Sequence, residues 1–139
     1  MPVILIAEDE EVNYLYLEAL LKKKLECNCH LIHVKNGLDA VNKIKSDNKI
    51  DIVLMDIKMP VMDGNTATQK VKKLKPQLPV IALTAYSSES DRKKAFSHGY
   101  DEFISKPVNA GLLINMIKKH INVNWKIQTN NFQAPAKMS

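Results

Sequence analysis

The chain has 139 residues, enough for one domain with its own core, and its 45% hydrophobic and 25% charged composition is ordinary for a globular protein. Its formal net charge is +5, but the basic residues are nearly all lysines scattered along predicted helices. Because interfaces that read bases favour arginine, we do not expect direct nucleic-acid binding. No apolar stretch approaches the roughly 20 residues of a membrane span and no secretory leader is recognisable, so we expect a cytoplasmic domain without membrane contact.

Short apolar runs bounded by polar or turn-forming residues predict five strands. They cover residues 3–7, 31–34, 52–55, 80–83 and the weaker pair 103–104. The strands alternate with segments that have a helical pattern. After the first strand, apolar residues at i, i+3, i+4, i+7 and i+8 predict one face of a helix, at positions 12, 15, 16, 19 and 20.

Four further helices are expected along the chain. The second begins near Asn36–Gly37, and the third begins near Asn65 and stops before Pro76. A polar fourth helix covers residues 88–97 and ends at His98–Gly99, where the glycine fits a helix C-terminus. The fifth has a stripe of Leu112, Leu113, Met116, Ile117 and His120.

Strands that alternate with helices predict an α/β fold with a doubly wound, five-stranded parallel sheet flanked by five helices. We assign residues 1–121 to this domain. From about residue 122 the pattern gives way to polar residues, so we expect 122–139 to be a flexible C-terminal tail with Trp125 and Phe132 as its large side chains.

Two cysteines, Cys27 and Cys29, precede His30 and His33. Their spacing matches no common zinc-binding pattern, and the segment leads into a predicted strand. We therefore expect reduced thiols with a structural role.

Three carboxylates are predicted to meet at one edge of the sheet. Asp56 ends the third apolar run, and Glu8 and Asp9 follow the first. Because the carboxyl ends of parallel strands share an edge, these groups would repel one another unless a cation or protons intervened. Mg²⁺ prefers such oxygen ligands and often bridges to a phosphate. Helix capping is the alternative role for Glu8 or Asp9 taken singly.

A hydroxyl and an ammonium group follow the last two strands. Thr84 can donate to a phosphate oxygen, and Lys106 can neutralise the charge of a phosphate. Pro107 could hold the lysine inward through a cis peptide bond. The set indicates that Asp56 is a nucleophile that forms an aspartyl phosphate, with Mg²⁺ and Lys106 stabilising the transferring group.

The chain resembles the receiver domains of response regulators in two-component signalling. The resemblance spans roughly residues 3–121 and depends on four motifs: Glu8–Asp9, Asp56 in Met-Asp-Ile-Lys-Met-Pro-Val-Met-Asp-Gly, Leu-Thr-Ala at 83–85, and Lys106–Pro107. It implies a flavodoxin-like receiver fold with strand order 2-1-3-4-5. It also implies that Asp56 is the phosphoacceptor and modified residue.

The same resemblance assigns the other site residues. Glu8, Asp9, Asp56 and the backbone carbonyl of Lys58 would be the Mg²⁺ ligands. Thr84 and Lys106 would contact the phosphoryl group. Thr84 and Phe103 would form a switch that alters the surface made by the fourth helix, fifth strand and fifth helix on phosphorylation.

The run from Glu8 to Asn13 resembles receivers of hybrid sensor histidine kinases. This implies a sensor histidine kinase core, a histidine phosphotransfer protein, or both, as partners, with contact through the first helix. A stand-alone single-domain regulator is the alternative. We expect a monomer or weak dimer that assists its own phosphorylation and dephosphorylation without being a turnover enzyme, although a full-length parent would be a histidine kinase.

Three other classes fit less well. A haloacid-dehalogenase-like phosphatase would need a second aspartate where Lys58 stands, and a non-phosphorylated pseudo-receiver usually lacks one of the site residues kept here. A flavodoxin-like cofactor carrier would need a phosphate-binding loop after the first strand, but Glu8 and Asp9 would repel a phosphate there.

Overall fold

Five parallel strands form one sheet in the order β2-β1-β3-β4-β5, which confirms the order that the resemblance implied. The computed structural model describes residues 1–25 and 29–121. The strands are β1 (Val3–Ala7), β2 (His30–Val34), β3 (Ile52–Asp56), β4 (Val80–Thr84) and β5 (Glu102–Ser105). The helices are α1 (Glu11–Leu25), α2 (Gly37–Ser46), α3 (Gly64–Leu74), α4 (Glu89–Ser97) and α5 (Ala110–His120).

Polar residues start four of the helices, and the starts of α2, α3 and α4 agree with the sequence prediction to within a few residues. Asn36, Asp63, Ser88 and Asn109 each accept a hydrogen bond from the backbone N–H three residues later. After α4, Gly99 has a φ of 108°, the left-handed backbone that suits glycine at a helix end.

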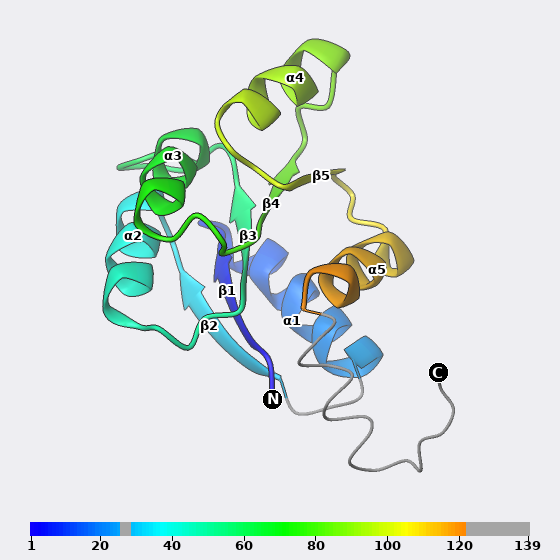
Figure 1. The fold of residues 1–139 in the computed structure, drawn as a ribbon. Coiled ribbons are helices and arrows are strands. Elements are labelled where there is room, and N and C mark those ends of the chain that lie inside the picture. Colours follow the sequence, from blue (N-terminus) through cyan, green and yellow to red (C-terminus); the bar gives the residue numbers. More distant parts are fainter. Residues whose placement is uncertain (26–28, 122–139) are drawn as a thin grey trace.

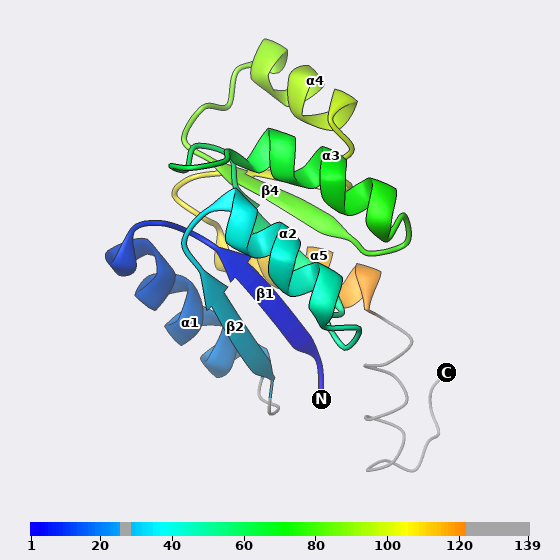
Figure 2. The same ribbon diagram turned by 90° about the vertical axis from the view of Figure 1, so that its left-hand side faces the viewer.

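The helices cover both faces of the sheet. Helices α1 and α5 lie on one face, and α2, α3 and α4 lie on the other (Figures 1 and 2). Strands β3 and β4 are buried along their whole length because they are central and covered on both sides. Burial of this kind fixes the strand ends, and hence any side chain placed there.

Of the apolar stripe expected on the first helix, only Leu20 faces the core, where it is 8% exposed. Val12 is 78% exposed, Leu15 49% and Tyr16 52%, whereas Tyr14 and Leu17 on the adjacent face are buried. Helix α1 is apolar on more than one face, so periodicity alone could not select the side that packs on the sheet. The consequence is an exposed apolar surface on α1.

The fifth helix shows a smaller difference of the same kind. Leu112, assigned to the apolar stripe, is 46% exposed, and Ile114 is buried instead. Of the remaining expectations, Cys27 and the tail 122–139 lie outside the described residues. Across residues 1–25 and 29–121, no helix is both long and apolar enough to cross a membrane.

Candidate functional site

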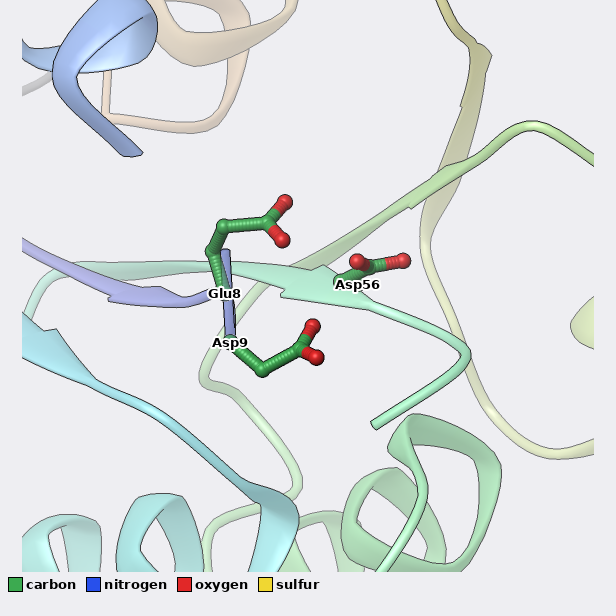
Figure 3. A group of neighbouring side chains, drawn as sticks. All are labelled: Glu8, Asp9 and Asp56. Atoms are coloured by element: carbon green, nitrogen blue, oxygen red, sulfur yellow. The ribbon is translucent and has the colours of Figure 1, made fainter. Parts of the chain in front are cut away.

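The carboxyl ends of β1 and β3 bring three carboxylates together. Glu8 and Asp9 directly follow β1, and Asp56 is the last residue of β3. One oxygen of each lies within 4.8 Å of the others, and Figure 3 shows the side chains gathered at this edge of the sheet. Within the described part of the chain, this is the one group of three or more His, Cys, Asp or Glu side chains able to share a metal ion.

A close approach of helix α3 shapes the floor beneath Asp56. A Cβ atom on Gly64 would collide with the backbone carbonyl of Asp56 and lie 2.8 Å from the hydroxyl of Tyr100. Only glycine lets the first turn of α3 approach the end of β3 this closely. Packing therefore requires glycine at position 64.

Lys106 joins two of the carboxylates from the other side of the site. Its backbone N–H donates to the Thr84 carbonyl at 2.8 Å, which holds the end of β5 beside β4. The Lys106–Pro107 peptide bond is cis, as the sequence suggested. The Lys106 ammonium donates to Glu8 Oε1 at 3.0 Å and to Asp56 Oδ2 at 3.1 Å.

Burial and charge make this site electrostatically unbalanced. Burial of Asp56, followed by repulsion from Glu8, raises its pKa from 3.8 to about 6, although Lys106 acts in the opposite direction. Partial burial by itself would lower the pKa of Lys106, but its contacts with Glu8 and Asp56 raise it above the ordinary value. One ammonium therefore does not compensate three carboxylates.

These residues fit a hard divalent cation. The three groups supply only oxygen ligands, Glu8 is fully buried, and Asp9 is partly exposed, so the site is open to water on one side. Mg²⁺ commonly uses one or two carboxylates and keeps several waters. Such an ion would offset the repulsion between Glu8 and Asp56 that, after burial, raises the pKa of Asp56.

Thr84 and Phe103 lie where the sequence analysis placed them, at the end of β4 and within β5. Thr84 is 1% exposed, and its hydroxyl oxygen accepts the backbone N–H of Tyr86 at 3.0 Å. Phe103 is 5% exposed, with its ring 6.5 Å from that of Phe96 on α4. Lys58 is exposed, and its ammonium lies 5.3 Å from the centre of the Tyr86 ring.

Sequence reasoning gave no role to Arg92. Its guanidinium lies 5.5 Å from the centre of the Phe96 ring and 5.6 Å from that of Phe103, so it covers both rings from the exposed side of α4. The spacing of Arg92 and Phe96, four residues apart on one helix, was the available signal. Phe103 comes from another element, and only the fold brings it to them.

An apolar groove of about 300 Å³ adjoins the site between α1 and the loop from β5 to α5. The Tyr16 hydroxyl spans the groove by donating to the Val108 carbonyl at 3.2 Å. The lining combines site residues with apolar side chains: Glu8, Val12, Asn13, Tyr16, Leu17, Lys106, Pro107 and Val108. The exposed face of α1 thus continues directly into the carboxylate cluster.

The chain belongs to the response regulator receiver domain family, whose family model matches residues 4–118. This places it among the receiver domains of two-component signalling and confirms the resemblance read from the sequence. Hybrid signal transduction histidine kinase G of Dictyostelium discoideum is 37% identical over 121 residues, which are 84% of this chain and 3% of that relative. The chain therefore spans only a small part of this curated relative.

Solved structures agree with the family and the fold. The receiver domain of sensor histidine kinase PA1611 from Pseudomonas aeruginosa PAO1, solved with magnesium in its active-site cleft, has a TM-score of 0.78 and 29% identity over 87% of this chain and 98% of that one. The receiver domain of Ssk1 from Saccharomyces cerevisiae, solved with the histidine phosphotransfer protein Ypd1, has a TM-score of 0.76 and 28% identity over 86% of this chain and 88% of that one.

Proposed function

We propose that this receiver domain accepts a phosphoryl group on Asp56 from a phosphohistidine in a Mg²⁺-dependent reaction. A carboxylate oxygen of Asp56 attacks phosphorus, and the P–N bond breaks as the O–P bond forms. The leaving imidazole nitrogen keeps the bonding electron pair and takes a proton from water. The observation that carries this proposal is the convergence of Glu8, Asp9 and Asp56 within 4.8 Å, with Lys106 bonded to two of them.

The neighbouring residues have separate tasks in this proposal. Glu8, Asp9, Asp56 and the backbone carbonyl of Lys58 hold Mg²⁺, which neutralises negative charge on the transferring group. Lys106 is already 3.1 Å from Asp56 Oδ2, so its ammonium is in place to contact a phosphoryl group on that residue. The Thr84 hydroxyl supplies a further hydrogen bond through its O–H, which is compatible with accepting the Tyr86 N–H because a hydroxyl can donate and accept at once.

Phosphorylation would be transmitted through Thr84 and Phe103. Movement of the Thr84 hydroxyl toward the phosphate changes the β4–α4 connection, and the aromatic side chain beside it must adjust. Contact of Phe103 with Phe96 and Arg92 supports this route, because the three side chains join β5 to α4. We propose that the surface formed by α4, β5 and α5 is the part that responds.

A histidine phosphotransfer protein or a histidine kinase core is the partner that the site supports. The donor must bring its phosphohistidine to Asp56, and the groove beside α1 offers an exposed apolar surface that leads to Glu8 and Lys106. The similarity to a hybrid histidine kinase and to a receiver solved with a phosphotransfer protein supports a phosphorelay. A stand-alone regulator would use the same surface.

Intact-mass measurement tests the proposal. The protein is incubated with acetyl phosphate with and without Mg²⁺, and we expect a gain of one phosphoryl group only with the metal. Asp56→Asn should show no gain, and Asp51→Asn, a control at the opposite end of the sheet, should behave as the unsubstituted protein. Equal phosphorylation of Asp56→Asn would overturn the assignment, and sustained multiple turnover of a phosphomonoester would favour a phosphatase.

A further inference from the structure

His33 lies on strand β2, next to the acidic loop, which is defined as residues 8–10 between β1 and α1. The sheet register pairs His33 with Ile6, and the Glu8 N–H continues this pairing by donating to the Val34 carbonyl at 3.0 Å. The His33 ring lies on the α1 side of the sheet, since it stacks on Tyr14 of that helix. It therefore reaches the first residue of the acidic loop from outside the carboxylate cluster.

One hydrogen bond connects this ring to the loop. His33 Nε2 is 2.8 Å from the main-chain carbonyl oxygen of Glu8. A carbonyl oxygen can only accept, so Nε2 carries the hydrogen and donates it. The contact therefore requires a hydrogen on Nε2, whatever the state of Nδ1.

Tyr14 stacks on the His33 ring and restricts its orientation. The two ring centres are 3.7 Å apart, and the planes differ by 4°. Tyr14 is itself 8% exposed, and its hydroxyl donates to Glu18 at 3.4 Å. Because a stacked and largely buried partner restricts rotation of the imidazole, the donor points steadily at Glu8.

The bonded carbonyl controls the direction of two proposed metal ligands. It belongs to the planar peptide that links Glu8 to Asp9, so fixing the carbonyl fixes that whole plane. The Glu8 and Asp9 side chains branch from the Cα atoms at the two ends of this peptide, so its orientation affects both. Mutual repulsion of the carboxylates favours rotation of the peptide away from the cluster, and the His33 bond opposes that rotation.

We infer that His33 is a positioning residue for the metal site, which it organises by holding the Glu8–Asp9 peptide through one donated hydrogen bond. The inference rests on the proposed Mg²⁺ site, although the hydrogen bond exists without the metal. Groups behind metal ligands that fix their orientation commonly affect metal affinity by an order of magnitude. For a single bond to a backbone carbonyl we expect about a three- to tenfold change.

Two substitutions of His33 distinguish the effect of the N–H donor from the effect of the aromatic ring. His33→Phe keeps a flat ring against Tyr14 and removes the N–H, whereas His33→Gln keeps an N–H near the position of Nε2 and removes the ring. We expect His33→Phe to bind Mg²⁺ about three- to tenfold more weakly by calorimetry, and His33→Gln to recover most of the affinity. His30→Phe, the same change at the far end of the same strand, should leave Mg²⁺ binding unchanged.

Nuclear magnetic resonance of the metal-free protein provides a second readout. A proton on His33 Nε2, together with a shift of the Asp9 amide in His33→Phe but not in His30→Phe, supports the bond without any metal. Equal Mg²⁺ affinity of folded His33→Phe and the unsubstituted protein would overturn the positioning role, as would an equal loss in His33→Phe and His33→Gln. If the unsubstituted protein shows the NMR signature but no saturable Mg²⁺ binding, the metal site itself fails, and with it the role of His33.

Discussion

Replacing Asp56 with asparagine is expected to stabilise the metal-free protein at neutral pH. The Asp56 side chain is about nine-tenths buried beside the fully buried Glu8, and its pKa is raised to about 6 by burial and by that neighbour. Asparagine has nearly the same shape as the protonated acid but never ionises. The substitution therefore removes the cost of a buried, like-charged pair and leaves Lys106 its bond to Glu8 at 3.0 Å.

The size of the effect follows from the pKa. The folded state raises the Asp56 pKa from 3.8 to about 6, so it binds the proton more tightly than the unfolded chain does. The free energy of unfolding therefore falls as the pH rises between these values and is constant above them. Two pKa units correspond to about 3 kcal/mol, a figure that already contains the opposing attraction of Lys106.

Denaturant unfolding in the presence of a chelator measures this difference. We expect Asp56→Asn to be more stable than the unsubstituted protein by about 2–3 kcal/mol at about pH 7.5, and by roughly half as much at about pH 5. Added Mg²⁺ should reduce this difference in the free energy of unfolding, because it binds the folded unsubstituted protein more tightly than folded Asp56→Asn. Equal stabilities at about pH 7.5, or a gap that does not change with pH, would refute the electrostatic reasoning.

Two other changes test the surroundings of the site. Val12→Asp, at a residue that is 78% exposed, should leave stability within about 0.5 kcal/mol but weaken phosphotransfer from a histidine phosphotransfer protein roughly tenfold, measured as the initial rate of phosphoryl transfer. Leu38→Asp, also at the second position of a helix, is the control; equal rates in both variants would exclude α1 as the docking surface. Alanine substitution of either Lys58 or Tyr86 removes their contact and should open the acyl phosphate to water. We expect hydrolysis about two- to fivefold faster, measured as the rate at which the mass of the phosphoryl group is lost. An unchanged lifetime in both variants would contradict that role.

Local sequence signals were sufficient for most of the site. Asp56, Glu8 and Asp9 stand at the ends of apolar runs, and the ends of parallel strands meet at one edge whatever the details of packing. The polar cap residues fixed the helix starts in the same way, because their hydrogen bonds reach only three residues along the chain. These features depend on residues that are close in the sequence, so they can be predicted from the sequence alone.

Features that depend on contacts between distant segments could not be predicted from the sequence. The side of α1 that faces the sheet could not be chosen from periodicity, because Tyr14 and Leu17 on one face compete with Val12 and Tyr16 on another. Packing against β1 and α5 makes that choice and leaves Val12 and Tyr16 exposed beside the groove.

The sequence by itself determined the alternation of strands and helices and the carboxylates, hydroxyl and ammonium at the strand ends, because spacing along the chain encodes both. The tertiary structure decided how these groups influence one another. The raised pKa of Asp56 requires its burial beside Glu8, and the hold of His33 on the acidic loop requires β2 and α1 to meet. Electrostatic and hydrogen-bond energies depend on distances through space, and folding sets those distances.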